Sequence, residues 1–447
     1  MKRKTLAVSL SAILAASVLF GCGSNSKSGD TKSSSNNGSA SASASDTSNT
    51  GSDASGSGIQ YDGDDVTITY WHTHGDSEEE VLVDTIIPEF EKQYPNIHVD
   101  AVRMPYDGLM QQIITSLSSG TGPDLMRMDI IWVPELAEMG AVDDLEGFAD
   151  LKDNLYEGPL STNYYNGKYY GLPLNTNCLS GVYSKTMMEE LNIDSIPTTY
   201  DEVVALKDKL GSDQYLIACE GANSWAMAPL FHSLGGVYTN EDYTKASGYV
   251  NSEDSVKALE TIVEWYDEGI IGPCFTGGKP DAANGLYDGN YLFSYQGPWF
   301  FTNDDEENLA KVEVGLLPAG KAGSLTVNGG EDLVMFESSD KKEASWVFAM
   351  FLMSEFSQTA QAVGGGHLIP TVKTIAESEE VQAVPNMSTY IEQLEGAVSR
   401  TPSPAWEKIS DKLSVAFQSA VLHEDTAQSA LDKIAPELDA LLAGEAS

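Results

Sequence analysis

The sequence predicts an alternating α/β protein built on a parallel sheet. Short apolar runs over 66–71, 97–102 and 124–128 read as strands, and apolar residues recur at helical spacing over 78–94 and 106–117. Strands and helices therefore alternate along the chain and are joined by short connections. This order implies parallel pairing of the strands through helical crossovers.

The rest of the chain continues this pattern. Pro88 lies within the first predicted helix and should kink it. Thr199 and Glu202 form a capping box before a helix that we expect to reach about Leu210. Further predicted elements are a helix from Ser252 to Gly269, a strand over 291–295, and a mainly helical C-terminal third with helices over 341–363, from Pro404 and from Glu424.

The N-terminus predicts export. Basic residues at 2–4 precede a mostly apolar stretch over 6–20, which is too short to cross a bilayer. The residues before Cys22 resemble a bacterial lipobox, in which the Cys thiol receives a diacylglycerol. We expect a signal peptide over 1–21 and a lipid anchor at Cys22; the alternative is an ordinary secreted protein with an incidental Cys.

A tether is expected after the lipid anchor. Residues 23–58 are almost wholly small and polar, so they cannot bury enough apolar surface to fold. We therefore predict a flexible tether over 22–60 that holds the folded part at the outer face of the cell membrane. Folded sequence begins near Tyr61 and leaves roughly 385 residues, enough for two domains.

The charge balance excludes one class of partner. The chain has 25 Lys and Arg residues against 67 Asp and Glu residues, a formal charge of −42. Nucleic acids and anionic membrane surfaces both attract basic patches, so neither is an expected partner. A GxxxxGK[ST] motif for ATP is also absent from the sequence.

Cysteine and histidine spacing predicts no metal site and no cofactor. Cys178, Cys219 and Cys274 form no CxxC pair, and no Cys/His cluster has zinc spacing. We expect these cysteines to be small buried hydrophobes, with one disulfide among them left open. His72 and His74 have no evident third ligand nearby.

Aromatic residues with polar neighbours lie at predicted strand ends and helix starts. In open parallel sheets, ligands bind at the carboxyl ends of the strands. An aromatic ring packs on the apolar face of a sugar while polar side chains bind its hydroxyl groups, so the pattern favours a sugar site. For any single ring, burial in the core is the alternative. The rings are Trp71, Tyr106, Trp132, Trp225, Trp299 and Trp406, whereas the mid-helix Trp265 and Trp346 are assigned to the core.

Several motifs in order resemble one family. They include Pro-Glu-Phe-Glu-Lys-Gln-Tyr-Pro-Asn-Ile at 88–97, Gly-Thr-Gly-Pro-Asp-Leu at 120–125, Gly-Lys-Tyr-Tyr-Gly-Leu-Pro at 167–173, Val-Tyr-Ser-Lys at 182–185 and Gln-Gly-Pro-Trp at 296–299. Together they are similar to the sugar-binding extracellular solute-binding proteins of ABC importers, the maltose-binding-protein group. The similarity runs from about Tyr61 to the C-terminus.

The resemblance implies a two-lobed, periplasmic-binding-protein-like fold of type II with a hinge crossed three times. The first α/β lobe would hold 61–175 and 334–365, and the second 178–330 and 368–447. The crossings would fall near 175–177, 331–332 and 364–366, where the glycines equally fit ordinary turns.

The resemblance also implies which residues line the cleft. Asp76 and Asp129 fit helix caps equally well, and a surface ion pair is the alternative for Arg400. The first-lobe wall would comprise Trp71, Asp76, Tyr106, Asp129 and Trp132; the second would comprise Trp225, Trp299, Arg400 and Trp406, with Asn175 at the floor.

The expected function is capture of a carbohydrate, an oligosaccharide, by hinge closure and its delivery to the membrane subunits of an ABC importer. The protein is expected to be a monomer and not an enzyme. A tethered extracellular glycoside hydrolase and the ligand-binding partner of a sensor kinase are the alternatives. The identity, length and linkage of the sugar stay open.

Overall fold

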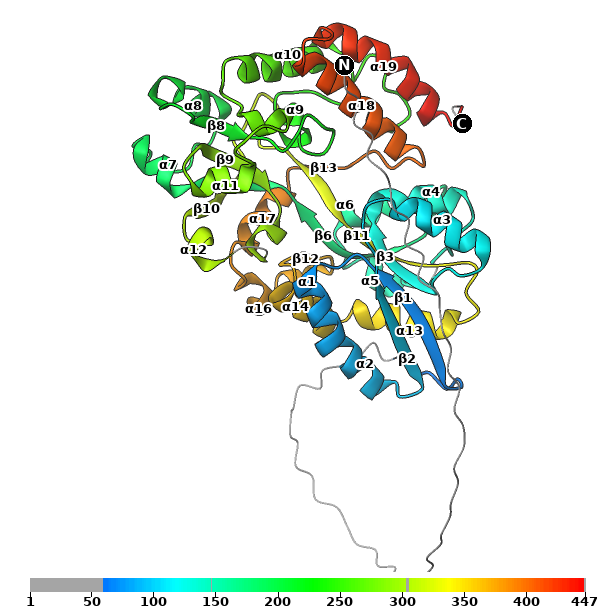
Figure 1. The fold of residues 1–447 in the computed structure, drawn as a ribbon. Helices are drawn as coiled ribbons and strands as arrows, with labels where there is room; N and C mark the ends of the chain where they lie inside the picture. The colour runs from blue at the N-terminus through cyan, green and yellow to red at the C-terminus, as the bar shows by residue number, and fades with distance from the viewer. Residues whose placement is uncertain (1–58, 146, 303–304, 446–447) are drawn as a thin grey trace, which may run out of the picture. The chain divides into compact units, whose positions relative to one another are not determined.

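The computed structural model describes residues 59–145, 147–302 and 305–445, which fold around two β-sheets (Figure 1). The predicted signal peptide, Cys22 and nearly all of the predicted tether lie outside the described residues. Within the described ranges, every helix is too short or too polar to cross a membrane.

The larger sheet contains the predicted parallel strands. β1 pairs in parallel with both β2 and β3, which confirms the α/β prediction for the first part of the chain. β11 runs antiparallel between β3 and β6. The order is β12 (Ile369–Pro370), β6 (Leu172–Cys178), β11 (Thr326–Met335), β3 (Leu125–Asp129), β1 (Val66–His72) and β2 (Ile97–Arg103), with β13 (Ala397–Val398) beside β11.

The smaller sheet begins directly after β6, because only Leu179 separates that strand from β7. Its order is β10 (Val312–Gly315), β7 (Ser180–Ser184), β9 (Tyr291–Gln296) and β8 (Tyr215–Ala218). β8 and β9 are parallel and the other pairs are antiparallel. A separate hairpin joins β4 (Tyr164–Tyr165) to β5 (Lys168–Tyr169).

Helices cover both sheets (Figure 1). The first part of the chain contributes α1 (Asp76–Val81), α2 (Ile87–Gln93), α3 (Leu109–Ser119), α4 (Val133–Glu138), α5 (Ala149–Lys152) and α6 (Glu157–Thr162). The middle part contributes α7 (Lys185–Glu190), α8 (Tyr200–Val204), α9 (Ala228–Ser233), α10 (Glu253–Asp267), α11 (Ala282–Tyr287) and α12 (Glu306–Leu309). The last part contributes α13 (Lys342–Leu352), α14 (Glu355–Gly364), α15 (Lys373–Ala376), α16 (Glu379–Gln382), α17 (Met387–Leu394), α18 (Trp406–Val421) and α19 (Ala427–Leu442).

Short 3₁₀ and π segments connect these helices. A π-helical segment, η1 (Leu82–Ile86), separates α1 from α2, and Pro88 is the second residue of α2. Proline lacks the N–H that would continue the hydrogen bonding, so Pro88 lies where the helix expected over 78–94 is interrupted by the π segment. The remaining segments are the 3₁₀ turns η2 (Ile130–Trp132), η3 (Lys207–Lys209), η4 (Pro273–Thr276) and η5 (Pro298–Thr302).

Several helix boundaries were wrong. The helix expected over 341–363 is divided into α13 and α14, because Ser354 caps the start of α14, and the helix expected over 106–117 begins at Leu109. Thr199 caps α8 as predicted, because its side chain accepts a hydrogen bond from the backbone N–H of Glu202. The helix ends at Val204 instead of reaching Leu210. Its continuation tightens into the 3₁₀ turn η3, with i to i−3 backbone bonds that include Lys209 to Leu206.

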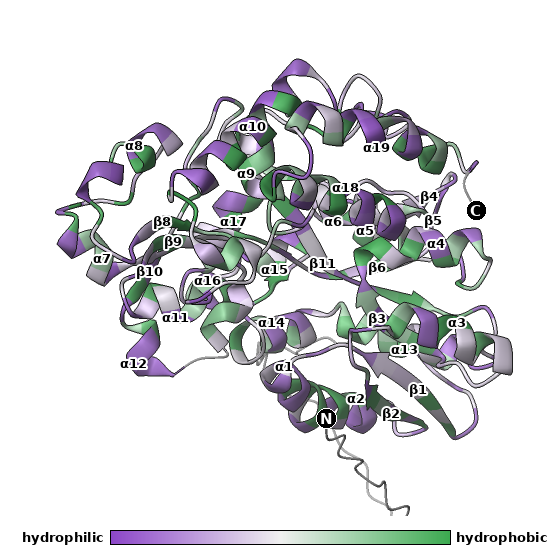
Figure 2. Cartoon of the chain, turned by 45° about the horizontal axis from the view of Figure 1, so that its top comes forward, coloured by the Kyte–Doolittle hydropathy of each residue, from purple (hydrophilic) through white to green (hydrophobic). Residues whose placement is uncertain are grey.

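Each sheet has its own packed apolar cluster. Strands β8 and β9 are strongly hydrophobic in Figure 2, whereas the outer turns of α8 and α10 are hydrophilic. The apolar cluster of the smaller sheet also includes buried residues of α18 and α19. The segment from Ile369 to Tyr390, which the sequence assigned to the second lobe, packs into the cluster of the larger sheet. The division into lobes stays a prediction.

The three described cysteines behave as predicted. Cys178, Cys219 and Cys274 are buried free thiols, and burial raises the pKa of all three. They fill space in the core as small apolar side chains.

Gly330 allows β11 to lie against β6. Its φ is +140°, and an added Cβ would lie 2.5 Å from the carbonyl oxygen of Asn175 and 2.9 Å from the Cα of Thr176. Both contacts are backbone, which cannot move aside. A bulge follows between Glu331 and Asp332. Glycine is therefore required at this point of β11, where the strand lies against β6.

We expect Gly330→Ala to lower the free energy of unfolding in urea by about 2 kcal/mol or more. Gly329→Ala is the matched control, since its added Cβ would meet only the ends of two side chains. Gly329→Ala should lower the free energy of unfolding by less than half as much as Gly330→Ala does. A loss below about 0.5 kcal/mol for Gly330→Ala would contradict the strained geometry.

Candidate functional site

A cavity of about 400 Å³ lies where β6 and β11 meet the ends of η2, α9, η5 and α18. This volume falls within the range of small-molecule sites. Of the ten predicted cleft residues, six line it: Tyr106, Asp129, Trp225, Trp299, Arg400 and Trp406. The structure thus brings together three of the five indole rings that the sequence placed at the cleft.

An ion pair joins two of these residues across the cavity. Nη2 of Arg400 lies 2.8 Å from Oδ1 of Asp129, and Tyr106 donates its hydroxyl hydrogen to Oδ2 at 2.9 Å. The guanidinium also lies over the Trp225 ring, 5.1 Å from the ring centroid. Asp129 belongs to β3, whereas Arg400 precedes α18, so the pair links segments far apart in the sequence.

Two roles that the sequence treated as alternatives coincide at Asp129. Its Oδ1 accepts a hydrogen bond from the backbone N–H of Ile131 at 3.1 Å and caps η2, while the same carboxylate binds Arg400. The cap fixes the carboxylate at the end of β3. Asp129 therefore faces the cavity in a defined orientation.

Trp132 lies behind the cavity wall. Its side chain is buried, its ring centroid is 5.0 Å from that of Tyr106, and its Nε1–H donates to Glu407 at 2.7 Å. The ring supports Tyr106 and connects η2 to α18, but it is not among the residues that line the cavity.

Trp71 and Asp76 also lie outside the cavity lining. Trp71 is half-buried and packs against the apolar cluster that includes Met110 and Leu136. Asp76 is almost fully exposed and pairs with Arg103 at 2.6 Å. The N-cap of α1 is Gly75, so Asp76 is the first helical residue.

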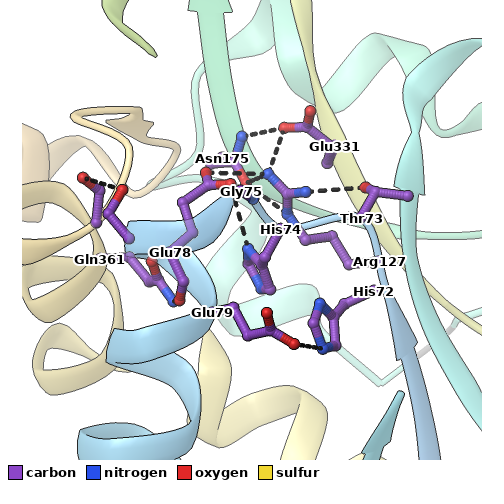
Figure 3. Close-up of polar contacts among 12 residues, drawn as sticks. His72, Thr73, His74, Gly75, Glu78, Glu79, Arg127, Asn175, Glu331 and Gln361 are labelled. Atoms are coloured by element: carbon purple, nitrogen blue, oxygen red, sulfur yellow. Dashed lines mark hydrogen bonds and ion pairs between the residues drawn. The ribbon is translucent and has the colours of Figure 1, made fainter. Parts of the chain in front are cut away.

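Asn175 takes part in a polar network beneath the cavity (Figure 3). Its Oδ1 accepts hydrogen bonds from Arg127 at 3.3 Å, and its amide donates to Glu331. Arg127, on β3, is buried and also contacts Glu331 at 3.0 Å, Glu78 at 3.4 Å and Thr73 at 3.0 Å. One guanidinium thus compensates two carboxylates.

Burial and Arg127 act in opposite directions on these carboxylates. Burial alone would raise the pKa of Glu78, but Arg127 and His74 hold that pKa well below its ordinary value. Burial dominates at Glu331 and raises its pKa, and the attraction of Arg127 offsets only part of the rise. Glu331 also lines the cavity.

Sequence reasoning missed Arg127, Asn177, His232 and Glu331. Asn177 and Glu331 fall in two of the predicted hinge crossings. These two segments were therefore identified from the sequence, but as flexible backbone and not as part of the binding site. Arg127 stands within the apolar strand Leu-Met-Arg-Met. An unpaired charge is rarely buried, and this placement already indicated a carboxylate partner.

Three histidines near the network and the cavity are held neutral. Burial lowers the pKa of His72 to about 3, and the pKa values of His74 and His232 to about 4. Nearby His74 and Arg127 also disfavour a charge on His72. Among the described residues, no group of three His, Cys, Asp or Glu side chains is arranged to hold a metal ion.

These histidines predict acid sensitivity. In the unfolded chain each binds a proton near pH 6.5, but in the folded protein only near pH 3 to 4, so stability falls as the pH drops below 6.5. The loss is up to about 2 kcal/mol per histidine at pH 5. Ordinary carboxylates begin to protonate only below this window.

Thermal unfolding at pH 7.5, 6.5, 5.5 and 5.0 should show this falling melting temperature. The variant His232→Gln should show a smaller drop over the same range. Because the raised pKa of buried Glu331 stabilises the folded state as the pH falls, the comparison of the two proteins is the test: an equal drop for His232→Gln would contradict the buried neutral state of His232.

Comparison with known proteins assigns the fold to a family. The family model described as bacterial extracellular solute-binding protein matches residues 85–389. A relative from Brucella abortus is 26% identical over 365 residues, covering 79% of this chain and 88% of the relative.

Two solved structures share the fold. The GacH receptor of Streptomyces glaucescens, studied unliganded and in complex with acarbose, has a TM-score of 0.76 at 20% identity and covers 84% of this chain and 98% of its own. An ABC transporter solute-binding protein of Thermotoga lettingae, bound with α-D-tagatose, has a TM-score of 0.73 at 25% identity. The match covers 84% of this chain and 99% of that protein.

Proposed function

Because the chain belongs to the bacterial extracellular solute-binding protein family, we propose that it captures a carbohydrate in the cavity beside β11. The expected ligand is an oligosaccharide, and the expected recipient is the membrane part of an ABC importer. The structural relatives support this proposal, since one was solved with acarbose and another, an ABC transporter protein, with tagatose.

The observation that carries the proposal is the composition of the cavity wall. Trp225, Trp299 and Trp406 present indole rings next to the charged pair of Asp129 and Arg400. Aromatic faces pack on the C–H faces of a pyranose, and charged or amide groups bind its hydroxyl groups. This division of roles fits a sugar better than an apolar ligand.

We also propose where the protein is held and how it captures the sugar. The lipid anchor at Cys22 and the tether would hold a monomer at the outer face of the membrane, at high local concentration around the importer. The cleft residues would bind sugar from both predicted lobes and favour their closure, to the extent that the ligand binds the closed state more tightly. Catalysis has no part in it.

A thermal-shift screen tests the proposal. We expect at least one mono- or oligosaccharide to raise the melting temperature, because a ligand at a hundred times its Kd stabilises the folded state by about 2.7 kcal/mol. Amino acids and divalent metal ions are the comparison sets. Stabilisation by these sets alone, or conversion of a bound oligosaccharide to shorter products, would contradict the proposal.

We expect Trp299→Ala to abolish sugar binding in calorimetry and to leave the melting temperature of the free protein nearly unchanged, because Trp299 is only half-buried at the cavity wall. Trp346→Phe is the control, since Trp346 packs in the cluster of the larger sheet away from the cavity lining. The control should bind as the natural protein does. Retained binding by Trp299→Ala would remove this ring from the site.

A further inference from the structure

We propose that Asn177, Gly329 and Glu331 form a notch of hydrogen-bond acceptors that selects uncharged sugars and excludes sugars carrying a carboxylate or a phosphate. The notch lies on β6 and β11, where both strands line the cavity. The inference rests on the proposed carbohydrate function. It adds the residues and the charge preference that determine which sugars bind.

Asn177 supplies an acceptor that the protein leaves unused. Its side chain is only 5% exposed, yet no donor among the described residues reaches its Oδ1. A buried amide oxygen without a partner costs about 1–3 kcal/mol. Asn177 lines the cavity but its Oδ1 is shielded from solvent, so a rotation of the amide toward the cavity would let a hydroxyl group of a bound sugar donate to this oxygen and recover that cost.

Gly329 lets the Asn177 oxygen and the Trp225 ring lie close together against β11. It is the cross-strand partner of Asn177, and an added Cβ would lie 2.2 Å from Oδ1 of Asn177 and 2.9 Å from Cη2 of Trp225. The two side chains therefore converge on the space that a larger residue would fill. An acceptor beside an indole edge can bind a hydroxyl group while the ring contacts the sugar.

Glu331 supplies the second acceptor of the notch. Arg127 and Asn175 both contact its Oε2, and Figure 3 shows its other oxygen turned away from the guanidinium. The network thus holds the carboxylate in one orientation at the cavity wall. Two acceptors near each other bind hydroxyl hydrogens and repel anionic groups.

Among the described residues that line the cavity, the one arginine, Arg400, is already paired with Asp129, although its Nε–H has no acceptor. The two guanidinium groups, of Arg127 and Arg400, are shared among three carboxylates, of Glu78, Asp129 and Glu331. His232, also in the lining, has a pKa lowered to about 4 by burial, so it is neutral at pH 7. The formal charge of −42 on the chain acts in the same direction.

Calorimetry with matched probes at pH 7.5 tests this proposal. The neutral probes are glucose, galactose, maltose, lactose and cellobiose, and the anionic probes are glucuronate, galacturonate and glucose 6-phosphate. We expect binding within the neutral set and none within the anionic set. An anionic probe that binds as tightly as its neutral counterpart would overturn the proposal.

Variants assign the selectivity to the notch. Asn177→Ala removes an oxygen that has no protein partner. It should therefore weaken binding of the neutral probe at least tenfold without lowering the melting temperature. Gly329→Ala should weaken binding to a similar extent, because its Cβ would displace the Asn177 oxygen. Asn328→Ala is the control, because Asn328 is also buried on β11 but does not line the cavity. The control should keep the Kd within twofold.

Glu331→Gln tests the charge. It should raise the affinity for the anionic probes relative to the neutral ones at least tenfold, and an unchanged ratio would overturn the electrostatic part. Binding that Asn177→Ala leaves within twofold would overturn the notch while leaving the carbohydrate function intact. If none of the neutral probes binds, a saccharide that raises the melting temperature in the thermal-shift screen takes their place. A screen in which no saccharide binds would remove the proposed function, and this inference with it.

Discussion

The buried guanidinium of Arg127 is the constraint on which the floor of the cavity depends. It joins β3, which carries it, to Thr73 after β1, to Glu78 on α1 and to Glu331 on β11. Removing the guanidinium would leave the carboxylates of Glu78 and Glu331 without a counter-charge in the interior, which costs several kcal/mol. The network therefore fixes the positions of the strands, and with them the side chains that face the cavity.

A second set of contacts joins the cavity walls. The ion pair between Asp129 and Arg400 and the hydrogen bond from Trp132 to Glu407 both connect the β3–η2 segment to the chain around the start of α18. A sugar that enters must add contacts to this arrangement or replace its hydrogen bonds with better ones. Under the proposed mechanism, only the difference in affinity between an open and a closed state can drive closure.

Most of the fold could be predicted from periodicity, because apolar spacing reports directly on buried faces. The early strands and the cap at Ser252 followed from it. The floor of the cavity could not, since Asn177, Gly329 and Glu331 are brought together only by the pairing of β6 with β11. Trp71 and Asp76 were predicted at the cleft but do not line the cavity. A position at a strand end beside a polar neighbour does not reveal which way a side chain points.

The central claim is that rings distant in sequence meet around one sugar. The most direct measurement is fluorine NMR of the protein labelled with 5-fluorotryptophan, titrated with a stabilising saccharide. The account predicts shifts for the resonances of Trp225, Trp299 and Trp406, with those of Trp265 and Trp346 unchanged. Sugar binding that leaves the first three unchanged, or that shifts the last two instead, would contradict it.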